Sequence, residues 1–283
     1  MFSPAEALRQ TLVRQVRETF NDQAKGERPV PASDNALYSR NSVVWRVHGD
    51  VTSMMVGGVS ALLMQMLHPA ALAGVWDHSD ARRDMIGRLR RTARFIAVTT
   101  YGERGTAEAA IAKVRAIHEK VSGLTPGGDG YRADDPRLLA WVHVAGAIMF
   151  LDGWRRYAEP RMSRADQDRY FAEAALVAEM LGADPVPNSR GAAERLIAEY
   201  RNELCADERT RAFRRIVLDA PAPSLKDAPV QKLLLAAAVD LLPDFARDMH
   251  GLKRFPLPPL AVRGATFAFA GTLRWAFSSR SYR

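Results

Sequence analysis

The sequence predicts an all-α protein that folds as a single domain over residues 1–283. Apolar residues recur at spacings of three and four along most of the chain, glycine and proline interrupt this pattern, and no sustained alternation of Val, Ile and Thr indicates a sheet. Hydrophobic residues make up 47% of the chain and charged residues 25%. This composition excludes a disordered chain, a collagen and a disulfide-rich scaffold.

The first predicted helix has a clear start signal. Ser3 is placed to cap it, Pro4 takes its first position, Glu6 completes a capping box, and apolar residues follow at every fourth position. These acidic and polar residues also argue against a secretory signal. Periodicity and breaks together predict helices over residues 3–24, 42–67, 69–77, 80–101, 104–122, 134–158, 163–181, 190–205, 207–218, 228–240, 242–250 and 258–278. The turn-rich connections, such as 122–135 and 182–188, are too short for domain linkers.

One segment, Val51 to Trp76, contains no Asp, Glu, Lys or Arg. Its length would suit a membrane span, but it contains two adjacent glycines, the polar residues Gln65 and His68, and a helix-breaking Pro69. We therefore expect a helix buried at the centre of the domain, where it can wall a cofactor pocket.

The second apolar stretch lies near the end of the chain, from Leu257 to Ala276, and is punctuated by Arg263 and Arg274. We expect a terminal helix packed on the core. A helix in peripheral contact with a membrane is the alternative.

The charge of +8 does not by itself indicate a nucleic-acid partner. All but six of the 40 basic residues are arginine, but they are spread along the chain and mixed with 32 acidic residues. A nucleic-acid footprint would gather them on one face with aromatic residues between them, so we expect no nucleic-acid partner. The single cysteine, Cys205, cannot form an internal disulfide, which favours a reducing, cytoplasmic location. We expect its thiol to be buried or half-buried.

Histidines on apolar helix faces are the first candidates for chemistry. His118 continues the stripe formed by Ile111 and Val114, which should face the core. It is either a core histidine bonded to a carbonyl or a ligand. His143 and His68 raise the same question. No spacing typical of a closed zinc or di-iron site is present, so a single histidine would serve best as an axial ligand to a macrocycle.

Basic and polar residues also gather on one predicted helix. Arg88, Arg91, Thr92 and Phe95 lie on neighbouring positions of one side of it. They form either a solvated basic face or a cluster that holds haem propionates and donates hydrogen bonds to a bound oxygen.

Four segments in order resemble the catalytic domain shared by latex-clearing proteins (rubber oxygenases) and the ER-bound oxygenase MpaB. The resemblance is strongest over residues 43–204. It is carried by Gln65-Met-Leu-His68-Pro69-Ala-Ala-Leu-Ala-Gly74-Val75 with His78-Ser79, Arg88-Leu-x-Arg91-Thr92, His118-Glu-x-Val121-x-Gly123, and Tyr131-x-Ala133-x-Asp135-Pro136-x-Leu138-Leu139-x-Trp141-Val142-His143.

The resemblance implies an all-helical fold that encloses one haem b, with oxygen-dependent cleavage of a carbon–carbon double bond in the characterised members. It implies that His118 ligates the haem iron and that Arg88 and Thr92 lie on the distal side. Arg91 stands where the rubber-cleaving branch has a lysine that can coordinate iron, and a guanidinium has no lone pair for this. Arg91 is therefore expected to donate hydrogen bonds instead, and His68 and His143 to form hydrogen bonds near the cofactor.

These observations together predict a haem-b-dependent oxygenase that acts on an apolar, isoprenoid-like or aromatic substrate with O2. In this hypothesis Arg91, Thr92 and Arg88 serve catalysis, and they bind the cofactor together with His118, His68 and His143. The alternatives are a non-catalytic haem or lipid carrier and a basic protein that docks on an anionic surface.

Overall fold

The computed structural model confirms the all-α prediction, and it describes residues 4–21, 26–222, 224–252 and 258–278. Helices account for 71% of the structure, with almost no strand. The helices are α1 (Pro4–Phe20), α2 (Val43–His48), α3 (Val51–Gln65), α4 (Pro69–His78), η2 (Asp80–Arg82), α5 (Met85–Tyr101), α6 (Arg104–His118), α7 (Pro136–Tyr157), α8 (Arg164–Leu181), α9 (Arg190–Tyr200), η3 (Arg201–Glu203), α10 (Glu208–Leu218), α11 (Ala228–Leu241), α12 (Asp244–Met249) and α13 (Pro259–Phe277); the strands are β1 (Ser122–Leu124) and β2 (Gly130–Arg132).

Two of the predicted helices are broken in the structure. The segment predicted as one helix over 42–67 divides into α2 and α3, because α2 ends at Gly49 and the carboxylate of Asp50 caps α3 by accepting from the Ser53 N–H at 2.8 Å. The segment predicted over 80–101 divides in the same way into η2 and α5. There the Asp84 carboxylate accepts from the Gly87 N–H.

The predicted loop over 122–135 contains a small hairpin that the sequence did not indicate. Helix α6 ends at His118 rather than at 122, and β1 pairs antiparallel with β2 so that Ser122 lies opposite Arg132. Each strand has only three residues, too few for an alternating pattern to be recognised. The turn between them includes Gly128 at φ +91°, a conformation that glycine adopts readily.

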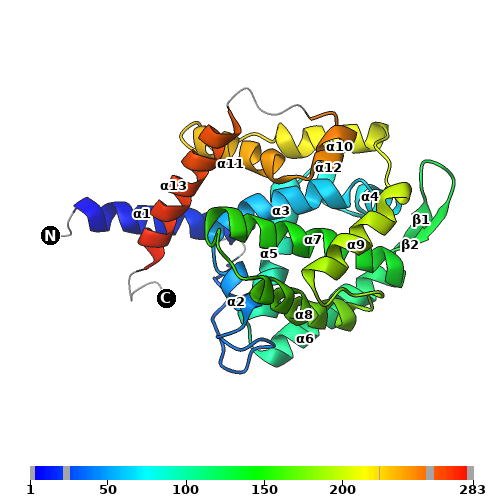
Figure 1. Cartoon of the computed structure of the whole chain (residues 1–283), viewed down its shortest axis with the longest axis horizontal. Helices are drawn as coiled ribbons and strands as arrows, with labels where there is room; N and C mark the ends of the chain where they lie inside the picture. Colours follow the sequence, from blue (N-terminus) through cyan, green and yellow to red (C-terminus); the bar gives the residue numbers. More distant parts are fainter. Residues whose placement is uncertain (1–3, 22–25, 223, 253–257, 279–283) are drawn as a thin grey trace.

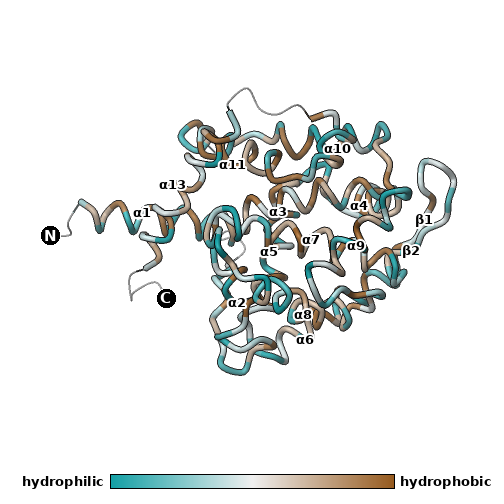
Figure 2. The backbone as a smooth tube through the Cα atoms, viewed as in Figure 1, coloured by the Kyte–Doolittle hydropathy of each residue, from teal (hydrophilic) through white to brown (hydrophobic). Residues whose placement is uncertain are grey.

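Helices α3 and α7 form the centre of the molecule and approach each other closely (Figure 1). A Cβ on Gly57 would lie 2.9 Å from the Met149 carbonyl oxygen, and one on Gly153 would lie 2.8 Å from that of Ser53. Both distances are too short for a side chain, so these two glycines allow the contact. Figure 2 shows hydrophobic residues along both helices. The central burial expected for α3 is observed.

Among the described residues, no single helix meets the length and hydropathy expected of a membrane span. Helices α3 and α4 taken together reach the required length and hydropathy, but the chain bends by 105° between them.

The α5–α6 pair forms a separate layer beside this centre. Helices α5 and α6 pack on each other; α2 packs on α5, and α8 packs on α6. The main contacts of α5 and α6 are therefore with each other and with α2 and α8, although Ala107 and Ile111 of α6 belong to the same hydrophobic core as α3 and α7. Consistent with this, the only fully buried residues of α5 lie at its two ends, Met85 at the start and Thr99 and Thr100 near the end. The middle of α5 is therefore only partly covered by protein.

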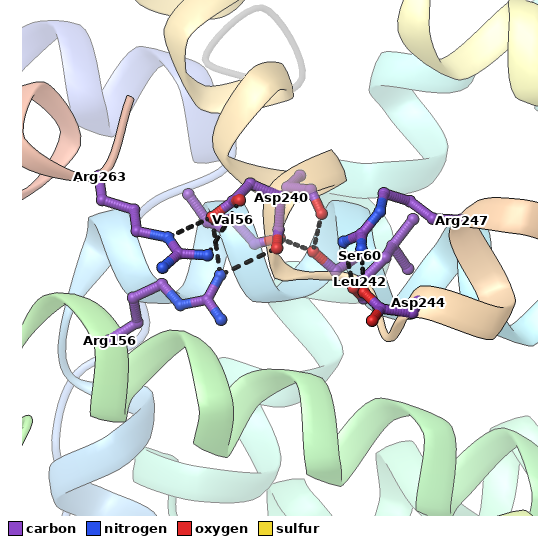
Figure 3. A network of polar contacts seen from close by, with 9 residues as sticks. Val56, Ser60, Arg156, Asp240, Leu242, Asp244, Arg247 and Arg263 are labelled. Carbon is purple, nitrogen blue, oxygen red and sulfur yellow. Dashed lines mark hydrogen bonds and ion pairs between the residues drawn. The ribbon is translucent and has the colours of Figure 1, made fainter. Parts of the chain in front are cut away.

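Buried ion pairs connect α13 to the centre. The Asp240 carboxylate on α11 receives Arg156 from α7 at 3.0 Å and Arg263 from α13 at 2.7 Å (Figure 3). Nearby, the Ser60 hydroxyl on α3 donates to the Ala238 carbonyl oxygen at 2.8 Å. Two cations compensate one buried carboxylate, so three helices are joined at one point.

The second such pair joins α13 to the start of α3. Asp50 is buried and receives Arg274 at 2.9 Å through one carboxylate oxygen, while the other oxygen accepts from the backbone and hydroxyl of Ser53. Asp50 therefore caps α3 and holds α13 at once.

His48 joins three helices through both of its ring nitrogens. Its Nδ1 lies 2.9 Å from the Thr100 hydroxyl on α5 and its Nε2 lies 3.2 Å from the Tyr170 hydroxyl on α8. Burial lowers the pKa of His48 to about 4. The imidazole is thus neutral at pH 7 in the folded protein.

We expect His48 to make folding sensitive to mild acid. The unfolded chain binds a proton at His48 near pH 6.5 and the folded chain only near pH 4, so the free energy of unfolding falls as the pH drops from about 6.5 to 4. Denaturant unfolding of His48→Gln across this range should give a shallower decline than the parent. The exposed His78→Gln should leave the decline unchanged. Parallel curves for His48→Gln and the parent would contradict this.

Candidate functional site

His118 is the last residue of α6 and is half-buried beside the β1–β2 hairpin. Its Nδ1 is buried, and no residue that the structure describes forms a hydrogen bond with either ring nitrogen. Burial lowers the pKa of His118, and the nearby Asp134 carboxylate partly opposes this shift. The ring is therefore neutral at pH 7, the form that can bind a metal.

His250 illustrates the structural alternative to a ligand. This buried histidine lies with its Nε2 at 2.9 Å from the Leu63 carbonyl oxygen, the usual way to satisfy a core imidazole. His118 makes no such bond in the described residues. His250 has one ring nitrogen bonded to the backbone and only its Nδ1 without a partner in the described residues, whereas His118 has no such backbone bond.

His143 lies in the middle of α7 with a buried Nε2 that also lacks a partner among the described residues. Burial lowers the pKa of His143 to about 4. Its backbone position is fixed by Gln65 at the end of α3. The Gln65 side-chain amide donates to the Val142 carbonyl at 2.7 Å, and the Trp141 indole donates to the Gln65 carbonyl at 3.0 Å.

Arg88 projects from the partly covered middle of α5. Its guanidinium is half-buried and forms no hydrogen bond or ion pair with any described residue. Burial lowers the pKa of Arg88, and the neighbouring Arg91 charge lowers it further. A partly buried cation without an acid is costly unless an anionic ligand compensates it.

Arg91 and Thr92 lie on the same helix but are more exposed. The Arg91 side chain is 56% exposed and lies 3.7 Å from the Asp84 carboxylate. The Thr92 hydroxyl donates to the Arg88 carbonyl oxygen at 3.1 Å within the helix. The structure therefore brings Arg88, Arg91 and Thr92 together on α5, as the sequence predicts for one helix side.

His68 occupies the corner between α3 and α4. Its Nδ1 accepts from the Ala70 N–H at 3.3 Å and so caps α4, while its Nε2 lies 3.7 Å from the Glu203 carboxylate. The rings of Trp141 and Tyr200 lie beside it. Burial lowers the pKa of His68, and Glu203 opposes this shift. All the described contacts of His68 serve the local structure.

Sequence reasoning missed two acidic residues of this region. One is Asp134, which pairs with Arg132 and acts electrostatically on His118, whereas the adjacent Asp135 caps α7 by accepting from the Leu138 N–H at 2.9 Å. Glu203 carried no signal, because it contacts His68 from a distant 3-10 turn. The expectation for Cys205 was wrong: the residue is exposed, although its backbone N–H donates to the Leu67 carbonyl at 2.8 Å.

Two of the described side chains have the chemistry needed to hold a haem. His118 supplies a neutral imidazole with an unpartnered buried nitrogen, and Arg88 supplies an uncompensated cation suited to a propionate. Arg88 lies on α5 and His118 ends α6, and these two helices pack on each other. No group of three His, Cys, Asp or Glu side chains that could hold a metal ion occurs among the described residues.

Comparison with known proteins gives one match. Residues 45–275 match the family model described as ER-bound oxygenase mpaB/B'/Rubber oxygenase, catalytic domain. The match extends beyond the 43–204 segment of the resemblance and reaches into α13. Searches among curated proteins and among solved structures give no significant match. Because the family model covers most of the 283 residues, the chain belongs to the mpaB/rubber oxygenase catalytic-domain family, a family of oxygenases.

Proposed function

We propose that this protein is a haem-b-dependent oxygenase that acts on a small or medium apolar substrate, isoprenoid-like or aromatic, with O2. Family membership supports oxygenase activity and, with it, a substrate and O2 as partners. The observation that carries the haem proposal is the neutral, half-buried His118, whose buried Nδ1 has no partner in the described residues. An imidazole in this state would be able to ligate haem iron.

Haem b, when bound, supplies the redox chemistry of the reaction. The chain supplies the environment. His118 would hold the iron, and Arg88, which has no acid among the described residues, would pair with a propionate. His143 would form hydrogen bonds near the cofactor from α7, and His68 would support this arrangement by fixing the corner before α4. The central helix α3 would wall the pocket.

Arg91 and Thr92 would act on dioxygen and not on iron. A guanidinium keeps its proton and has no lone pair, so Arg91 donates hydrogen bonds where negative charge develops on oxygen. Its pairing with Asp84 is long and exposed, which leaves its N–H groups available.

Replacing His118 should abolish specific haem binding. The purified parent, titrated with haemin, should develop a Soret band; His118→Ala should not, although its circular dichroism should stay helical. His78→Ala is the matched control, since His78 is exposed and should leave the band intact. An equal Soret band and equal affinity in His118→Ala would remove His118 as the ligand.

Replacing Arg88 should weaken haem binding without changing the ligand to iron. Loss of one charge-assisted contact to a propionate corresponds to about a tenfold or greater rise in the Kd for haemin. Arg88→Leu should show this rise and keep the position of the Soret band, whereas the exposed Arg83→Leu should bind as the parent does. If Arg88→Leu binds haemin as tightly as the parent, Arg88 does not contact the cofactor.

The Arg91→Ala variant should retain haem but respond differently to dioxygen. Loss of a donor to developing negative charge should change the rate at which the dithionite-reduced holoprotein is reoxidised by O2, by about tenfold or more. Stopped-flow absorbance measures this rate, and Arg83→Ala serves as the control. Identical reoxidation in Arg91→Ala and the parent would remove the role assigned to Arg91.

A further inference from the structure

Helix α13 presents an uncharged face to solvent. We define the outer α13 face by the exposed residues that recur at spacings of three and four along one side of the helix: Leu260, Gly264, Phe267, Ala268, Gly271 and Trp275. Its three large side chains are well exposed: Leu260 by 79%, Phe267 by 48% and Trp275 by 39%. An exposed apolar and aromatic strip of this length marks an interaction surface.

Both charged residues of α13 are paired with carboxylates outside this helix. The helix carries only two, Arg263 and Arg274, and these pair with Asp240 and Asp50 in the interior (Figure 3 shows Arg263). The outer face is thus free of charge because both arginines are engaged by buried carboxylates. It also carries no carboxylate that would repel an anionic partner.

The neighbouring helix α1 extends this surface. Helix α1 packs on α13 at one end of the molecule and projects beyond the helical body (Figure 1). Its Leu8 is 53% exposed, and only Val13 of its 17 residues is buried. A flat partner can therefore approach α1 and α13 at this end.

Arginines flank the aromatic residues of the face. The Arg9 guanidinium lies 4.6 Å from the centre of the Trp275 ring, and that of Arg274 lies 5.9 Å from the Phe267 ring. Arg14 on α1 is exposed, and the whole chain carries a net charge of +8. Apolar and aromatic side chains bordered by arginines complement a bilayer whose acyl chains are apolar and whose headgroups are negative.

We propose that the outer α13 face docks on an anionic lipid bilayer. Leu260 and Phe267 enter the acyl boundary, Trp275 lies at the headgroup level, and the exposed Arg14 of α1 contacts lipid phosphates. A second copy of the chain fits this face less well, because the face offers no carboxylate to receive the arginines of a partner molecule. The proposal is independent of haem binding.

Sedimentation with lipid vesicles tests the proposal on the full chain. The parent should sediment with vesicles of phosphatidylcholine and phosphatidylglycerol, and less with phosphatidylcholine alone or at high salt. The double variant Leu260→Ser/Phe267→Ser should lose at least about tenfold in affinity, since it removes two inserted side chains. Leu225→Ser is the matched control: Leu225 is 94% exposed but lies outside α13, and this variant should bind as the parent does.

Three outcomes would overturn the proposal: a parent that does not sediment with either vesicle, a double variant that binds as the parent does, or an equal loss in Leu225→Ser. Size-exclusion chromatography with light scattering tests the alternative that a second copy of the chain binds the outer α13 face. A dimeric parent that becomes monomeric in the double variant, without binding to vesicles, would assign the face to a second copy of the chain. Circular dichroism of each variant verifies that these exposed substitutions leave the helices intact.

Discussion

The close contact between α3 and α7 is the constraint on which the rest of this structure depends. Gly57 and Gly153 allow the two backbones to approach to a distance that any side chain at these positions would prevent. The contact aligns Gln65 with Trp141 and Val142, so that two hydrogen bonds fix the backbone beside His143. Packing at the centre of the molecule thereby determines where a candidate site residue lies.

The α5–α6 layer stands in contrast to this centre. It is attached mainly through α1, α2, α8 and η2, and the middle of α5 stays only partly covered. Half-buried polar groups without partners in the described residues, the imidazole of His118 and the guanidinium of Arg88, belong to this layer. Folding tolerates such groups where a ligand satisfies them, which is why the proposed cofactor and the incomplete packing support each other.

Much of the fold could be predicted from the sequence because helix signals are local. Apolar periodicity, with breaks at glycine and proline, predicted most elements. The break at Gly49 and Asp50 was missed because the apolar pattern continues through it, and a cap there becomes evident only when the Asp50 carboxylate is seen to accept from Ser53. The hairpin was missed because strands of three residues have no period.

The candidate site was predictable only in part. Placing Arg88, Arg91 and Thr92 on one helix requires nothing beyond helical spacing, and the structure brings them together. The relation of His118 to Asp134 and of His68 to Glu203 depends on chain reversals that no local pattern encodes. The exposure of Cys205 likewise depends on how the segment after η3 lies against the end of α3, where the Cys205 N–H donates to the Leu67 carbonyl. Residue identity was therefore easier to predict than residue environment.

The pair between Asp50 and Arg274 has a consequence for how the chain acquires its structure. The two residues are separated by 224 positions, and the carboxylate that starts the central helix is neutralised by a cation near the end of the last helix. During synthesis Asp50 emerges from the ribosome long before Arg274 does. The Asp50 carboxylate can cap α3 through Ser53 from the start, but it gains its compensating cation only after the last helix has been made.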